Sequence, residues 1–140
     1  MNESHTESRT GSCLCGQVRF SVSGDVKGVG RCLCSLCRKV SGANGNAVFL
    51  VPNEDFRWLA GESDTTKFSL PSGWSVLRCR KCGSPLPQSH DGKQMWVTAG
   101  LMDEDLGASV GLKIFVGSRA DWDCDDPNLL EFEEMAVSKK

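Results

Sequence analysis

Residues 77–86, LRCRKCGSPL, contain the feature that decides the fold, because Cys79 and Cys82 form a C-x-x-C pair followed directly by glycine. A glycine at that place lets the backbone turn tightly, so that amide N–H groups can point at the sulfurs, as in zinc knuckles. A C-x-C pair, Cys13 and Cys15, stands near the N-terminus. The two pairs together supply the four thiolates that a closed tetrahedral zinc site requires.

The alternative for these cysteines is a set of buried thiols without metal, since free cysteine packs as a small hydrophobic residue. Core cysteines have no reason to fall into paired C-x-C and C-x-x-C spacings, so metal binding is favoured. The polar N-terminal residues 1–10 lack the apolar stretch of a secretory signal. We therefore expect a cytoplasmic protein, in whose reducing surroundings thiols bind metal and do not form disulfides.

A third group of cysteines lies between those pairs, in RCLCSLCRKVSG at residues 31–42. Cys32, Cys34 and Cys37 form C-x-C-x-x-C, which brings three thiolates together in one short loop. Three protein ligands leave the fourth position of zinc for water or substrate, and this distinguishes catalytic from structural zinc. A substrate thiol would suit that position, because zinc binds thiols as thiolates. Two zinc ions per chain are expected.

Several residues offer alternatives or additions to this open site. Cys124 or His90 would make the second site closed and structural if either became its fourth ligand. Arg38 and Lys39 follow Cys37 directly, and their charge would offset the thiolates or hold an anionic ligand. The simpler interpretation of both cations is solvated charge on a loop.

Composition excludes several classes of function. The net charge of −2 gives no basic field for nucleic acid, and no apolar run approaches the length of a membrane span. A hydrolase with a nucleophilic serine or cysteine is disfavoured, because the chain has no Gly-x-Ser-x-Gly motif and one usable histidine. Small molecules or proteins are the expected partners, and the sequence does not determine the oligomeric state.

Short β-rich runs separated by Gly, Pro, Asn and Asp predict a mainly β domain with little helix. We expect one domain over residues 11–134, between an N-terminal tail at 1–10 and a C-terminal tail at 135–140. Helical turns are expected at 103–106 and at 128–133. The predicted strands lie within residues 18–24, 46–51, 56–61, 65–70, 74–79, 95–102 and 113–118.

The ordered segments GSCLCGQVRF, CLCSLCRKVSGA, LRCRKCGSPL, VTAGLMD and IFVGSRADW resemble the glutathione-dependent formaldehyde-activating enzyme family, also known as the centromere protein V-like family. The resemblance covers nearly all of residues 11–127. It implies an Mss4-like fold, in which small antiparallel sheets surround a zinc site. The family's reaction joins glutathione and formaldehyde and is classed as a carbon–sulfur lyase reaction.

The resemblance also implies roles for individual cysteines. The resemblance implies two zinc sites. Many family members carry a histidine at the position where this chain has Lys113. The structural site would consist of Cys13, Cys15, Cys79 and Cys82, and the site of glutathione chemistry would consist of Cys32, Cys34 and Cys37.

Two other functions remain open at this stage. One is a non-catalytic zinc module that docks a protein partner. The other is methionine sulfoxide reduction, which rests on the shared fold alone and would need Cys124 as its nucleophile.

Overall fold

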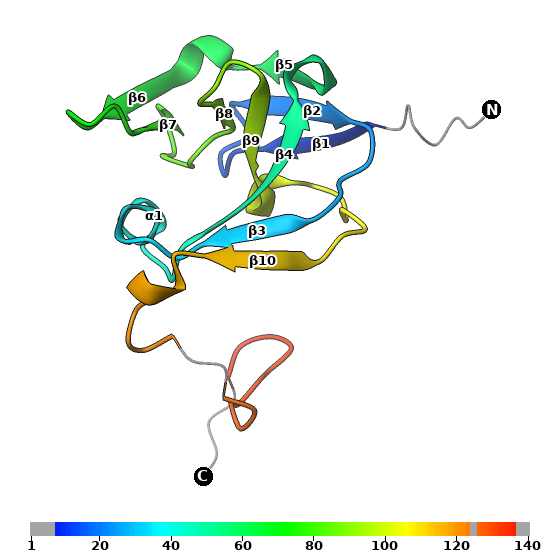
Figure 1. Cartoon of the computed structure of the whole chain (residues 1–140). Coiled ribbons are helices and arrows are strands. Elements are labelled where there is room, and N and C mark those ends of the chain that lie inside the picture. Colours follow the sequence, from blue (N-terminus) through cyan, green and yellow to red (C-terminus); the bar gives the residue numbers. More distant parts are fainter. Residues whose placement is uncertain (1–7, 124–125, 137–140) are drawn as a thin grey trace.

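The structure is a computed structural model that describes residues 8–123 and 126–136. It confirms the prediction of a mainly β fold with little helix. Figure 1 shows its strands and its one α-helix, α1 at Ser35–Ser41. The strands are β1 Ser8–Ser12, β2 Arg19–Ser23, β3 Val29–Cys32, β4 Asn46–Pro52, β5 Phe56–Ala60, β6 Thr65–Ser69, β7 Ser75–Cys79, β8 Gln88–Ser89, β9 Gln94–Thr98 and β10 Val110–Ile114. The 3₁₀ turns are η2 Asn53–Asp55, η3 Glu62–Asp64, η4 Ala99–Leu101 and η5 Val116–Ser118.

The strands form three sheets within the described part of the chain. The first is three-stranded in the order β1-β2-β5, the second is five-stranded in the order β10-β3-β4-β9-β8, and the third is the β6–β7 hairpin. Most neighbouring strands are antiparallel, as expected, but β10 runs parallel to β3. This parallel pair places β10 at an edge of the five-stranded sheet.

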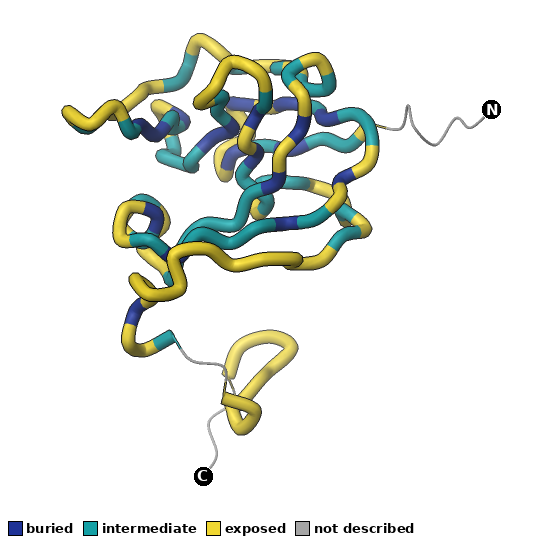
Figure 2. Tube along the Cα trace, in the orientation of Figure 1, coloured by how far each residue is buried: buried dark blue, intermediate teal, exposed yellow. Residues whose placement is uncertain are grey.

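The main core lies between the first two sheets, and strand periodicity explains its composition. Buried residues alternate with exposed ones along β4, where Phe49 and Val51 flank the exposed Leu50. β9 repeats the pattern with Met95 and Val97. Successive strand side chains point to opposite faces, so these residues meet the buried residues of β2 on one side of the sheet. Figure 2 shows the buried segments between the sheets and the exposed stretches outside them.

A second, smaller core joins the loop after β1 to the end of β7. It consists of Cys13, Val18, Cys79 and Leu86. Two cysteines of the predicted structural site therefore belong to the hydrophobic interior.

The predicted helical turn at 103–106 is wrong. The carboxylates of Asp103 and Glu104 bind β1 instead: the Thr10 hydroxyl donates to Asp103 at 3.0 Å, and the Thr10 amide donates to Glu104 at 2.6 Å. The amide of Asp103 donates to the carbonyl of Thr10 at 2.9 Å. These bonds hold the segment against the strand and replace the bonds of a helical turn.

The predicted turn at 128–133 is also wrong, since those residues form no helix and are exposed. So short a helix has no stability of its own in water without packing against the protein body. The structure adds elements that the pattern did not predict, namely β1, β3, β8 and α1. Because β1 begins at Ser8, the last residues of the predicted N-terminal tail belong to a sheet.

Candidate metal centres

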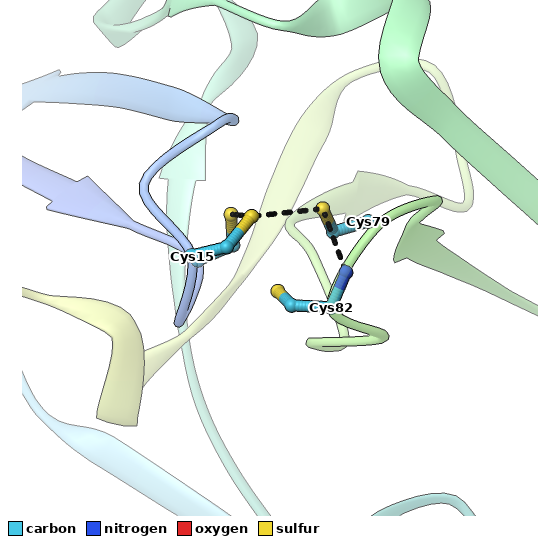
Figure 3. Close-up of side chains that lie close together, drawn as sticks. Cys15, Cys79 and Cys82 are labelled. Atoms are coloured by element: carbon cyan, nitrogen blue, oxygen red, sulfur yellow. Dashed lines mark hydrogen bonds between the residues drawn. The ribbon is translucent and has the colours of Figure 1, made fainter.

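The first cysteine cluster joins two loops that are far apart in the sequence. Cys13 and Cys15 follow β1, while Cys79 ends β7 and Cys82 lies in the turn beyond it. Their four sulfur atoms lie within 4.8 Å of one another. Figure 3 shows Cys15, Cys79 and Cys82 facing a common centre from these loops.

The spacing of these sulfurs fits tetrahedral metal binding. A Zn–S bond of about 2.3 Å places the sulfurs of a tetrahedral site roughly 3.8 Å apart. The Sγ atoms of Cys13 and Cys15 are 3.6 Å apart, and those of Cys15 and Cys79 are 3.8 Å apart. The first cluster therefore has the dimensions of a closed four-thiolate site.

Glycines shape both loops of the first cluster. Gly16 and Gly83 adopt positive φ angles of 81° and 83°, which residues with a side chain rarely adopt. The amide of Gly16 donates to the carbonyl of Cys13, and the amide of Gly83 donates to the carbonyl of Cys79. The two loops thus turn back on themselves in the same way, and the knuckle expected at Gly83 is present.

The electrostatics of the first cluster favour a bound cation. A backbone hydrogen bond at Gln17 acts to lower the pKa of Cys15, but burial and the neighbouring sulfurs outweigh it and raise that pKa to about 11. A hydrogen bond with the Ser84 hydroxyl lowers the pKa of Cys82 to about 5. Thiolates this close repel one another, so all four sulfurs can be ionised at neutral pH only around a positive ion.

The second cluster is local and is built around the start of α1. Cys32 ends β3, Cys34 is the N-cap of α1, and Cys37 lies in the first turn of that helix. The amide of Cys37 donates to the Sγ of Cys34 at 3.3 Å. The three sulfurs lie within 4.8 Å of one another, so this group could also hold a metal ion.

The thiols of the second cluster differ in their affinity for protons. Burial acts to raise the pKa of Cys34, but hydrogen bonds from the Cys37 amide and the neighbouring sulfurs hold it below its usual value. Burial and the two neighbouring sulfurs raise the pKa of Cys37, which is 9% exposed. As in the first cluster, a divalent ion would offset the electrostatic repulsion between adjacent thiolates.

Within residues 8–123 and 126–136, no fourth Cys, His, Asp or Glu ligand atom joins the second cluster. His90 is not in either group, and its ring packs edge-on against Trp96 with a centroid distance of 5.5 Å. Cys124, the other alternative fourth ligand, lies outside the described residues. Within the described residues, the second cluster is therefore a three-thiolate site.

A family model described as glutathione-dependent formaldehyde-activating enzyme matches residues 8–118. The chain belongs to this family. A Halomonas elongata protein named "Putative glutathione-dependent formaldehyde-activating enzyme" is 37% identical over 82 residues, which cover 54% of this chain and 52% of that protein. The chain thus spans about half the length of this curated relative.

A solved structure shares the fold of this family member. It is a crystal structure of a Rhodobacter sphaeroides protein, with a TM-score of 0.55 and 21% identity. The similarity covers 73% of this chain and 99% of that chain. At this identity the comparison establishes the fold alone.

The cations predicted near the second cluster lie in different surroundings. Arg38 follows Cys37 on α1, and its Nε atom is buried without a hydrogen-bond partner in the described structure. A buried donor of this kind is costly unless it binds an acceptor. Lys39 is exposed, and Lys113 lies on β10 opposite Arg31 of β3. Arg38 is therefore the better candidate for holding an anion.

A further residue, Arg78, links the two clusters and was not predicted. Its Nη1 donates to the carbonyl of Gly83 at 2.8 Å, in the turn that contains the C-x-x-C pair. Its Nη2 donates to the carbonyl of Val40 at 2.8 Å, on the helix that carries Cys37. A single half-buried guanidinium thus bridges the loop of one cluster and the helix of the other.

Replacing Arg78 by alanine is expected to lower the free energy of unfolding by about 2–3 kcal/mol, because hydrogen bonds from a charged donor are lost and two carbonyls lose their partners. Lysine at position 78 lacks the planar guanidinium that donates to two carbonyls at once, so it should recover at most half of the lost free energy of unfolding. Chemical denaturation in the presence of zinc measures the effect. The matched control is Arg80→Ala, since Arg80 makes one exposed bond, at 3.1 Å, to the Thr65 carbonyl. Equal stabilities of the Arg78→Ala and Arg80→Ala proteins would contradict a bridging role.

Proposed function

We propose that this protein is a zinc-dependent enzyme of the carbon–sulfur lyase type that acts on a small thiol adduct, formed from glutathione and formaldehyde. The observation that carries the proposal is the three-sulfur cluster of Cys32, Cys34 and Cys37, to which the described residues add no fourth ligand. Membership of the glutathione-dependent formaldehyde-activating enzyme family supports the choice of reaction.

In this reaction the glutathione sulfur forms a bond to the formaldehyde carbon. The carbonyl π bond breaks, its electron pair goes to oxygen, and a proton equivalent to that of the thiol ends on the hydroxyl group. The product is S-hydroxymethylglutathione, and the reverse direction breaks the same carbon–sulfur bond. Bound zinc would favour the thiolate form of the substrate at neutral pH.

The chain's own residues would hold and orient the substrate. The cysteines of the second cluster would be the zinc ligands, and those of the first would bind the structural zinc. The Arg38 guanidinium would pair with a glutathione carboxylate.

Other features agree with this proposal. The seven cysteines within the described residues are free thiols, which supports a cytoplasmic location. Among residues 8–123 and 126–136, no helix has the length and apolar character needed to cross a bilayer.

The test is binding and exchange with two thiols that differ in charge. We expect the zinc-loaded protein to bind glutathione and to accelerate its exchange with S-hydroxymethylglutathione, measured by NMR exchange spectroscopy. Arg38→Ala should weaken glutathione binding about tenfold, the loss expected for one hydrogen bond to a charged group. Binding of 2-mercaptoethanol, which has no carboxylate, should not change.

The control variant is Lys39→Ala, which removes the neighbouring exposed cation and should leave both thiols bound as in the parent protein. If glutathione neither binds nor exchanges faster in the zinc-loaded protein, the enzyme proposal fails. A zinc module that docks a protein partner would then be the better hypothesis.

A further inference from the structure

The C-terminal part of the chain leaves two apolar surfaces uncovered. The first, here named the β10 surface, lies on and just after the edge strand. Its side chains are between 43% and 61% exposed. It consists of Val110, Leu112, Ile114, Phe115 and Val116.

The second surface is the C-terminal segment, residues 126–136. All of these residues are exposed, with Leu130 at 85% and Met135 at 84%. Figure 1 shows the segment standing apart from the sheets, beyond η5, and Figure 2 shows both it and β10 as exposed. The segment therefore does not cover the β10 surface of its own chain.

The two surfaces match each other in pattern. On β10 the apolar Leu112 and Ile114 flank Lys113 and pair with Gly30 and Cys32 of β3, so these two side chains share one face, while Val110 lies beyond a register shift. The C-terminal segment alternates in the same way at residues 130–133, LEFE. An added strand with this pattern would set its leucine and phenylalanine against the apolar face of β10 and its glutamates on the other face.

The two surfaces also match in charge. Residues 126–136 contain Asp126, Glu131, Glu133 and Glu134 and no basic residue, whereas residues 110–116, which carry the β10 surface, contain Lys113 and no acidic residue. Charges of opposite sign favour contact between the two surfaces and oppose contact of either with itself. Because β10 pairs on one side only within the described structure, its other edge can accept a further strand.

We propose that two copies of this chain associate by exchange, with the C-terminal segment of each copy adding to the β10 edge of the other. A two-fold arrangement makes the contact twice, which doubles the buried apolar area. The exchanged segment would lie near the second cluster, because Ile114 of β10 is the register partner of Cys32. The C-terminal segment of the second copy would thus help to enclose the three-thiolate site.

The experiment is sedimentation equilibrium of the full zinc-loaded chain over a range of concentrations. We expect a species with twice the 15.2 kDa mass of the chain. The double variant Leu130→Asp with Phe132→Asp, and separately Leu112→Asp, should each raise the dimer dissociation constant at least about a hundredfold, since each removes the apolar contact at both copies. Phe68→Asp is the matched control, because Phe68 is 60% exposed on β6 and belongs to neither surface.

Mixing the segment variant with the Leu112→Asp variant provides a second measurement. Each mixed pair retains one intact segment facing one intact edge, so association should be partly restored. Zinc content of every variant should match the parent, which establishes that the substitutions did not unfold the chain. A parent protein that stays monomeric overturns the proposal, and so does a dimer that survives the Leu130 and Phe132 substitutions.

Discussion

Replacing Cys79 by serine is expected to give a chain that binds one zinc ion where the parent binds two, and that does not fold at 37 °C. Cys79 is 1% exposed and belongs to the smaller core as well as to the first cluster. Structural zinc contributes about 10–16 kcal/mol of apparent binding free energy in small zinc domains, whereas whole domains are stable by about 5–15 kcal/mol. Loss of the ion therefore removes an amount comparable to the entire stability of the protein.

Circular dichroism and zinc analysis measure this outcome together. The expected result is loss of the cooperative thermal transition with zinc present. Removal of zinc from the parent protein by a strong chelator should produce the same change in the spectrum. A Cys79→Ser protein that melts cooperatively within a few degrees of the parent would refute a structural role for the first cluster.

Replacing Cys37 by serine should have the opposite combination of effects. The substitution keeps the size of the side chain in α1 but removes one of three sulfurs, so the second zinc is lost while the first remains. Exchange of glutathione with its hydroxymethyl adduct should slow by at least about a hundredfold, the upper end of the range seen when outer-shell partners of metal ligands are removed. The thermal transition should persist.

Comparing these two variants tests whether the first cluster stabilises the fold while the second carries the chemistry. Equal loss of folding in both would mean that each cluster holds the structure together. Equal tolerance would mean that neither does. Unchanged exchange in the folded Cys37→Ser protein would place the chemistry elsewhere on the chain.

The sequence predicted the fold class and both sets of neighbouring cysteines, because ligand spacing within a loop is a local property. Cys32 and Cys37 are at most about 17 Å apart even in an extended chain, so one turn of the backbone is enough to bring the three sulfurs together. The meeting of Cys15 with Cys79 was predictable only because their pairs have the spacing of zinc knuckles. The metal itself and the role of each ligand stay predictions.

The helix was missed because its start signal is unusual. Ser, Thr, Asp and Asn are the common N-caps, whereas α1 is capped by the thiol of Cys34. The end of the helix has the usual sequence signal, a glycine: Gly42 adopts the left-handed conformation typical of a helix C-terminus. The strand β3 has no alternating pattern, and its conformation comes from pairing with β4 and β10 on either side.

Arg78 could not have been distinguished from the other cations by sequence. Its importance comes from two carbonyls that belong to distant parts of the chain, at Val40 and Gly83. Every residue has a backbone carbonyl that can accept a hydrogen bond, so the sequence does not indicate which residues accept from Arg78. Such a contact becomes visible only when the positions of α1 and β7 relative to each other are known.

The different reach of the two clusters along the chain has a consequence for the order of assembly. The second cluster closes within residues 32–37, whereas Cys15 and Cys79 of the first are 64 residues apart. Closing the longer loop costs about 2 kcal/mol more chain entropy in the unfolded state. A newly made chain can therefore hold metal at the short loop while the sheets are still forming. On the same reasoning, an ion at the first cluster would bind last, once the loops after β1 and β7 have met.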